Sequence, residues 1–143
     1  MKTLCVAAEA GRLDEVLSFI GSCLEGTQCS PKVQMQLDVA VEEMFVNIAC
    51  YAYEGSSLPD EERNAWIEAG MIDTDGVPCV RVTLKDKGIP YDPLAKEDPD
   101  ITLSAEDRKV GGLGIFMVKK SMDHVAYEYK EGMNVFTMEK KLS

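Results

Sequence analysis

The chain has few of the residues that build disulfide frameworks or zinc sites. Its five cysteines are odd in number and scattered, with no C-x-x-C pair, and His124 is the only histidine. Disulfide-rich and zinc-binding domains need paired or clustered ligands, so neither class is indicated. We expect free thiols in a reducing compartment, and His124 at the surface or at a strand edge.

Positive charge and long apolar runs are also scarce. The chain carries 15 Lys and Arg against 25 Asp and Glu, a net charge of −10. Direct nucleic-acid binding needs clustered Lys and Arg and is therefore not expected. No apolar run approaches the ~20 residues of a membrane helix, and the N-terminus has no signal-peptide pattern. We expect a cytoplasmic protein without a membrane partner.

What is present describes one globular domain over residues 1–143, with 45% hydrophobic residues. Ser30 followed by Pro31 is a strong signal for a helix start. We expect helices at residues 13–24, 31–54 and 113–122. We expect strands at residues 3–8, 79–86, 125–129 and 134–138.

Two segments between these elements have weaker patterns. Residues 56–77 are predicted to be a surface insertion that forms either a hairpin or a short acidic helix over 57–70, followed by a turn at 73–76. It would contact a partner or a second subunit, or be a tolerated insertion without such a role. Residues 87–110 contain three prolines and many carboxylates, which predicts a long functional or mobile loop. The predicted fold class is α+β, a two-layer α/β sandwich with helices on one face of a mixed, mostly antiparallel sheet.

Glu43 and Asn47 are one turn apart on the second predicted helix. At 100° per residue, both lie about 80–120° to one side of the apolar stripe, on one face at the border of the core. Phosphoryl transfer from ATP needs a divalent cation and an oriented nucleophile. A carboxylate can take the proton of that nucleophile, and an amide oxygen can bind Mg²⁺. The same spacing also fits a glutamate paired with a lysine and an asparagine that caps a loop.

Two further features contain glycine. Asp86 ends a predicted strand and Gly88 follows in the turn, which fits either a carboxylate that binds an exocyclic amine or a plain Asx turn. Gly111, Gly112 and Gly114 open the third helix, where free backbone N–H groups bind anions. A glycine cluster at this place is equally typical of a hinge. The spacing is that of neither a Walker A loop nor a dinucleotide fingerprint.

Taken together, these segments resemble the motifs of the GHKL ATPase and kinase superfamily. The segment 37–53 resembles its N-box, 86–93 its first glycine box and 111–116 its second. The Tyr-Ala-Tyr after Asn47, the Pro-Tyr-Asp-Pro string and Gly-Gly-Leu-Gly-Ile-Phe resemble the anti-sigma-factor serine/threonine kinase branch. The similarity spans nearly the whole chain and implies the GHKL (Bergerat) ATPase fold.

The resemblance implies a role for each matching residue. Glu43 would be the catalytic base, Asn47 the Mg²⁺ ligand, and Asp86 the contact to adenine N6, with Gly88 beside the ring. The phosphate-binding residues would be Gly111, Gly112, Gly114 and Arg108, under a lid formed by residues 94–111.

The implied cofactors are ATP and Mg²⁺, and the implied activity is that of a protein serine/threonine kinase. Enzymes of this branch phosphorylate a small anti-anti-sigma protein and alternately bind a sigma factor; a homodimer is a further candidate assembly. The chain has Pro90 where the wider superfamily has a second glycine, as this branch does. An alternative is a nucleotide-dependent binding module with vestigial catalysis that sequesters a regulatory partner.

Overall fold

The computed structural model describes residues 1–95 and 112–143. Its helices are α1 (Leu13–Leu24), α2 (Pro31–Asn47) and α3 (Gly112–Ser121). Its strands are β1 (Lys2–Ala7), β2 (Asn64–Thr74), β3 (Val77–Asp86), β4 (His124–Lys130) and β5 (Met133–Lys141). Single turns lie at Ala10–Arg12, Ile48–Ala52, Asp60–Glu62 and Pro93–Ala95.

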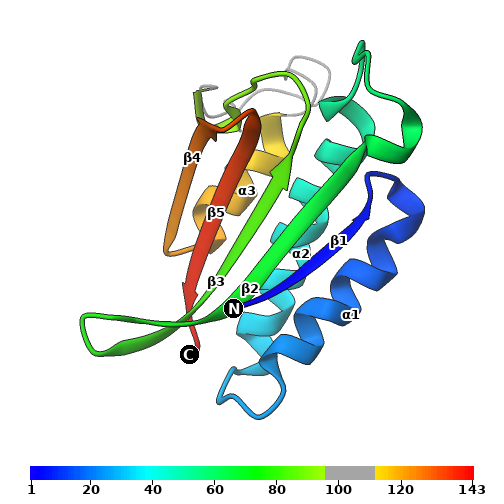
Figure 1. Cartoon of the computed structure of the whole chain (residues 1–143). Helices are drawn as coiled ribbons and strands as arrows, with labels where there is room; N and C mark the ends of the chain where they lie inside the picture. Colours follow the sequence, from blue (N-terminus) through cyan, green and yellow to red (C-terminus); the bar gives the residue numbers. More distant parts are fainter. Residues whose placement is uncertain (96–111) are drawn as a thin grey trace.

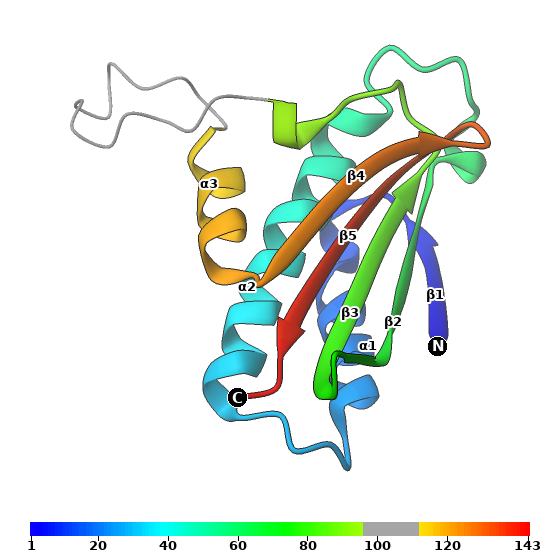
Figure 2. The ribbon, with the colours of Figure 1, turned by 90° about the vertical axis from the view of Figure 1, so that its left-hand side faces the viewer.

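The strands form one sheet in the order β1-β2-β3-β5-β4, and α1, α2 and α3 cover one face of it (Figures 1 and 2). All four pairings between the described strands are antiparallel. The sheet predicted from the sequence is mostly antiparallel with some parallel pairing, and no parallel pair occurs among these strands. Two of these pairs are hairpins whose two turn residues both have positive φ, at Asp75-Gly76 and at Glu131-Gly132. Such turns match the twist of antiparallel strands. The two-layer α+β architecture is confirmed.

The core lies between the helices and the covered face of the sheet. Helix α1 buries Val16 and Ile20, and α2 buries Leu37, Val41 and Phe45. The Ser30 hydroxyl accepts a hydrogen bond from the backbone N–H of Val33, which confirms the predicted start of α2. The alternating side chains of the inner strands face these helices, among them Ile67, Val82, Leu84 and Met138.

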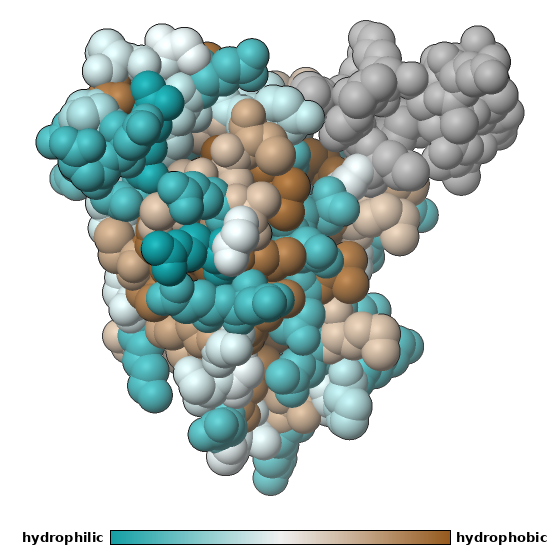
Figure 3. All heavy atoms as spheres, turned by 90° about the vertical axis from the view of Figure 1, so that its right-hand side faces the viewer, coloured by the Kyte–Doolittle hydropathy of each residue, from teal (hydrophilic) through white to brown (hydrophobic). Residues whose placement is uncertain are grey.

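The face beside α1 shows hydrophobic side chains only in patches between hydrophilic ones (Figure 3). Within residues 1–95 and 112–143, no helix is long and apolar enough to span a bilayer.

The segment 64–74 is a strand, so the predicted acidic helix over residues 57–70 is wrong. Strand β2 pairs with β1 on one side and β3 on the other, and buries Ala65, Ile67 and Ala69 against the helices. This alternation has a period of two, which outweighs the helix propensity of the glutamates and alanines. The acidic residues instead form the single turn Asp60–Glu62 before the strand, and the predicted turn at 73–76 is confirmed.

Helix α2 ends earlier than predicted. Regular α-helix stops at Asn47, and the chain continues as a π-helical turn over Ile48–Ala52 instead of running to Glu54. The backbone N–H of Ile48 approaches the carbonyl groups of both Met44 and Phe45 at this change of pitch. Single π-helical turns inside helices occur frequently at functional sites.

Candidate functional site

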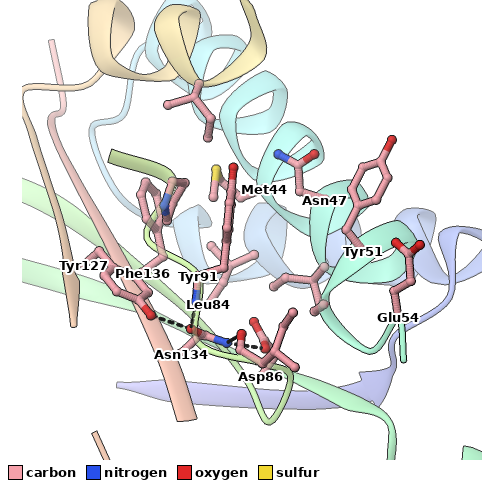
Figure 4. Close-up of a pocket in the computed structure, with 15 residues that line it drawn as sticks. Met44, Asn47, Tyr51, Glu54, Leu84, Asp86, Tyr91, Tyr127, Asn134 and Phe136 are labelled. Atoms are coloured by element: carbon pink, nitrogen blue, oxygen red, sulfur yellow. Dashed lines mark hydrogen bonds between the residues drawn. The ribbon is translucent and has the colours of Figure 1, made fainter. Parts of the chain in front are cut away.

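A cavity of about 510 Å³ lies between α2, the turn that follows it and the covered face of the sheet. This volume is typical of small-molecule sites. Its apolar wall includes Met44, Ile48, Leu84, Ile115 and Phe136. Its polar groups come from two sides (Figure 4). Asn47 lies on α2, Tyr51 on the π-helical turn and Glu54 just after that turn, whereas Asp86, Tyr127 and Asn134 lie on the sheet.

Asp86 ends β3 at the base of this cavity and is only 5% exposed. Its Oδ1 accepts hydrogen bonds from the backbone N–H of Gly88 at 2.8 Å and from Nδ2 of Asn134 at 2.9 Å. Within the described part of the chain, no donor is bound to its Oδ2, which is left to the cavity. Burial raises the pKa of Asp86, and the hydrogen bonds from Asn134 and Gly88 oppose that rise.

Gly88 makes a close backbone contact with the π-helical turn. A Cβ atom at Gly88 would lie 2.1 Å from the carbonyl oxygen of Ala52, and the same oxygen accepts the N–H of Ile89 at 3.2 Å. Only glycine allows this approach. Asp86 and Ile89 line the cavity on either side of it. That Gly88 lies beside a bound ring stays a prediction.

Asn47 and Glu43 occupy different places although they share a helix face. Asn47 lines the cavity, whereas Glu43 does not (Figure 4). The Glu43 carboxylate lies against Gly114 in the first turn of α3, where an added Cβ would be 2.2 Å from Oε2. The structure therefore brings the predicted base to the start of α3. Helix α3 begins at Gly112. Gly111, Arg108 and all of the predicted lid over 94–111 except its first two residues lie outside the described residues.

Asn134 is a site residue that the sequence patterns missed. It lies opposite Asp86 in the β3–β5 register. Its Nδ2 donates to Asp86 and to the carbonyl oxygen of Ile89, each at 2.9 Å. Its Oδ1 accepts from the Tyr127 hydroxyl at 2.5 Å and from the backbone N–H of Tyr91 at 3.1 Å. The one available signal was its place in a strand, which identifies a partner only once the strand pairing is known.

Tyr53 connects the end of the helical segment to the sheet. Its hydroxyl donates to the carbonyl oxygen of Asn64 at the start of β2 and accepts the backbone N–H of Lys87 at 2.9 Å. Burial raises the pKa of Tyr53, and it also raises the pKa of Tyr127. Both phenols therefore remain neutral where carboxylates titrate.

The donor set fits a nucleotide better than a metal held by protein alone. Among the described residues, no three acidic, histidine or cysteine side chains converge on a metal position. Asn47 offers one amide oxygen beside the cavity, and Mg²⁺ commonly takes few protein ligands together with phosphate oxygens and water. A buried acceptor at the base of an apolar slot fits a flat ring with an exocyclic amine.

This chain is similar in sequence and in fold to known proteins. The serine-protein kinase RsbW of Listeria monocytogenes is 27% identical over 103 residues, which cover 69% of this chain and 60% of that protein. The chain thus spans less than two thirds of the length of this curated relative. A chain in the crystal structure of the SiaB–SiaC complex from Pseudomonas aeruginosa has the same fold, with a TM-score of 0.57, 14% identity, and coverage of 98% of this chain and 89% of that chain.

The family model of the histidine kinase-like ATPase domain matches residues 6–140. This range contains every described element of the cavity, from α2 through β3 to β5. The chain belongs to the histidine kinase-like ATPase family.

Proposed function

We propose that this chain binds ATP with Mg²⁺ and is a protein serine/threonine kinase that acts as an anti-sigma regulatory factor. Its substrate would be a small anti-anti-sigma protein, and it would exchange that partner for a sigma factor. The observation that carries the proposal is Asp86, a buried carboxylate whose Oδ2 is left to an apolar cavity of nucleotide size. The similarity to a serine-protein kinase supports the choice of acceptor.

Each part of the ligand would have its own binding residues. Asp86 Oδ2 would accept the exocyclic amine of adenine, while Met44, Leu84 and Phe136 exclude water from the ring. Asn47 would hold Mg²⁺, which when bound neutralises charge on the phosphates. The backbone of Gly111, Gly112 and Gly114, with Arg108, would receive the phosphates at the start of α3.

Glu43 would take the proton from the serine or threonine hydroxyl. The place of its carboxylate against Gly114 supports this role, because the start of α3 is where free backbone N–H groups attract phosphate. The alternative is an ATP- or ADP-dependent binding module without transfer. That alternative is favoured by one observation: Glu43 does not itself line the cavity.

Isothermal calorimetry of Mg²⁺-ATP with Asp86→Asn tests the site. The amide puts a donor where the adenine amine needs an acceptor, so affinity should fall by about tenfold or more, the cost of a mismatched buried polar pair (~1–3 kcal/mol). Asp73→Asn is the matched control, because Asp73 accepts the N–H of Gly76 in an exposed turn at the far end of the β2–β3 hairpin. Equal affinities for wild type and Asp86→Asn would remove Asp86 from the site.

A pair of α2 variants separates transfer from binding. Glu43→Gln keeps shape and polarity but cannot take a proton. Phosphate transfer to the anti-anti-sigma protein should therefore fall ~10²–10⁴-fold while ATP still binds. Asn47→Ala should lose the Mg²⁺-dependent part of ATP binding. Glu42→Gln, an exposed neighbour on the same helix, is the control. ATP binding by the wild type without any transfer would favour the binding module.

A further inference from the structure

The polar side chains at the base of the cavity form one buried network across two paired strands. Asp86 on β3 and Asn134 on β5 are direct cross-strand partners, 5% and 7% exposed (Figure 4). We propose that Asn134 is the positioning residue of this site: it holds Asp86 so that Oδ2 alone is offered to the ligand, and only as an acceptor. The inference rests on the proposed nucleotide site. It adds that the acceptor atom of Asp86 is positioned by Asn134, a residue that need not touch the base.

Backbone groups fix the orientation of the Asn134 amide. The N–H of Tyr91 can only donate and the carbonyl group of Ile89 can only accept. These two groups contact Oδ1 and Nδ2 of Asn134 at 3.1 Å and 2.9 Å. A flipped amide would face both with the wrong partner, so the amide has a single acceptable orientation. In that orientation Asn134 always presents a donor to Asp86.

This fixed donor determines which oxygen of Asp86 can carry a proton. Oδ1 receives two N–H groups, from Asn134 and from the backbone of Gly88. A proton on Oδ1 would oppose both donors, so protonation must occur on Oδ2. That atom is the acceptor that the ligand amine requires. A proton and an amino base therefore compete for Oδ2. The hydrogen bond from Asn134 lowers the pKa of Asp86, so it favours the ionised carboxylate that accepts the base.

Burial raises the pKa of Asp86 and the hydrogen bonds from Asn134 and Gly88 lower it. Other titratable groups also lie around Asp86. Tyr53, at the end of the helical segment, and Tyr127, on β4, interact with Asp86 electrostatically, and burial raises the pKa of both phenols. Asp92, in the loop after β3, interacts with Tyr127, and Glu54 lines the same cavity. Lys85 pairs with Glu68, and Lys87 lies over the ring of Trp66, so both chain neighbours of Asp86 have other partners.

The same amide holds the segment that follows Asp86. Through Ile89 and Tyr91 it fixes the loop over residues 89–91, and through Tyr127 it ties this loop to β4. Loss of the Tyr127 hydroxyl would leave Oδ1 of Asn134 with the N–H of Tyr91 alone among the described residues. The amide would then be held less firmly, and Asp86 would accept a proton more readily.

The test measures Mg²⁺-ATP affinity as a function of pH, together with the titration of the Asp86 carboxyl group by carbon-13 NMR without nucleotide. Asn134→Asp keeps the shape of the side chain but replaces the donor by a second carboxylate, so the two carboxylates share a proton. We expect at least a tenfold loss of affinity at neutral pH, and an Asp86 titration and an acid limb of binding that both move to higher pH. Tyr127→Phe should move both in the same direction by less.

Thr137→Val is the matched control, because Thr137 and Thr83 form the same kind of cross-strand polar pair on the opposite face of β3 and β5. Its pH profile should equal that of the wild type. If Asn134→Asp fails to fold, Tyr127→Phe decides, and an unshifted profile in it overturns the inference. If the wild type binds ATP normally but the pH profiles of the variants equal that of the wild type, this inference alone is overturned. No ATP binding by the wild type overturns the proposed function and this inference with it.

Discussion

At the scale of single residues, two glycines of the site differ in what a side chain would meet. At Gly88 a Cβ would lie 2.1 Å from a backbone oxygen and 2.6 Å from its carbon, both in Ala52. At Gly114 it would meet the end of a flexible side chain, Oε2 of Glu43 at 2.2 Å. Backbone atoms cannot move without shifting the whole turn, whereas a carboxylate can rotate.

Substitution by alanine should therefore affect stability at Gly88 and phosphate transfer at Gly114. We expect Gly88→Ala to lower the free energy of unfolding by about 3 kcal/mol, the upper end for overpacking. Gly114→Ala should melt near the wild-type temperature but lose phosphate transfer, because the Glu43 carboxylate is displaced. Gly11→Ala, with nothing within 4 Å of the new Cβ, is the control for both. A Gly114→Ala variant with full transfer would show that the position of Glu43 is unimportant.

At the scale of secondary structure elements, β2 has the place that the sequence patterns assigned to a surface insertion. Deletion of residues 57–75 would remove the strand that joins β1 to the rest of the sheet. It would also remove the buried side chains of Ala65, Ile67 and Ala69. The deletion is thus a test of the core and not of a partner surface.

We expect the chain without residues 57–75 to lose cooperative thermal unfolding, measured by circular dichroism. The matched control neutralises only the turn before β2, with Asp60→Asn, Glu61→Gln and Glu62→Gln together. These three side chains are exposed, so the control should fold and bind ATP as the wild type does. A cooperative transition in the deletion variant would contradict the assignment of β2 to the sheet core.

At the scale of the whole molecule, the net charge of −10 means that a carboxylate without a partner lowers the stability of the folded state. Asp38 on α2 is such a carboxylate, because its Oδ1 is buried and lacks a hydrogen-bond partner among the described residues. Burial raises the pKa of Asp38 above its ordinary value of 3.8. The folded state then binds more protons than the unfolded state over this window, so stability falls as pH rises from 3.8 through the raised pKa.

Asp38→Asn should therefore raise the melting temperature at neutral pH, because the substitution replaces the buried carboxylate by a neutral amide. The gain should shrink as pH falls toward 3.8 and vanish below it, because wild-type Asp38 is then neutral in both states. Thermal melts of both proteins across about pH 3–8 measure this difference. Glu42→Gln, exposed on the same helix, should show no such dependence. A constant difference at all pH values would mean that the Asp38 charge is not responsible.

The sequence by itself determined the features that depend on neighbours along the chain. Local backbone preferences account for the Ser30 cap, the turn at 73–76, the end of β3 at Asp86 and the start of α3, and the structure agrees with them. Local preference also misled where two patterns competed. Residues 64–74 have helix formers between β-type side chains, and pairing with β1 and β3 decided for a strand.

Only the tertiary structure decided which distant residues meet. Strand pairing places Asn134 opposite Asp86, 48 residues away, and the packing of α3 on α2 brings Gly114 against Glu43. The π-helical turn after Asn47 is fixed in the same way, because its last carbonyl group is held by Ile89 across Gly88. These contacts depend on the register of whole elements, and no short-range pattern in the chain encodes that register.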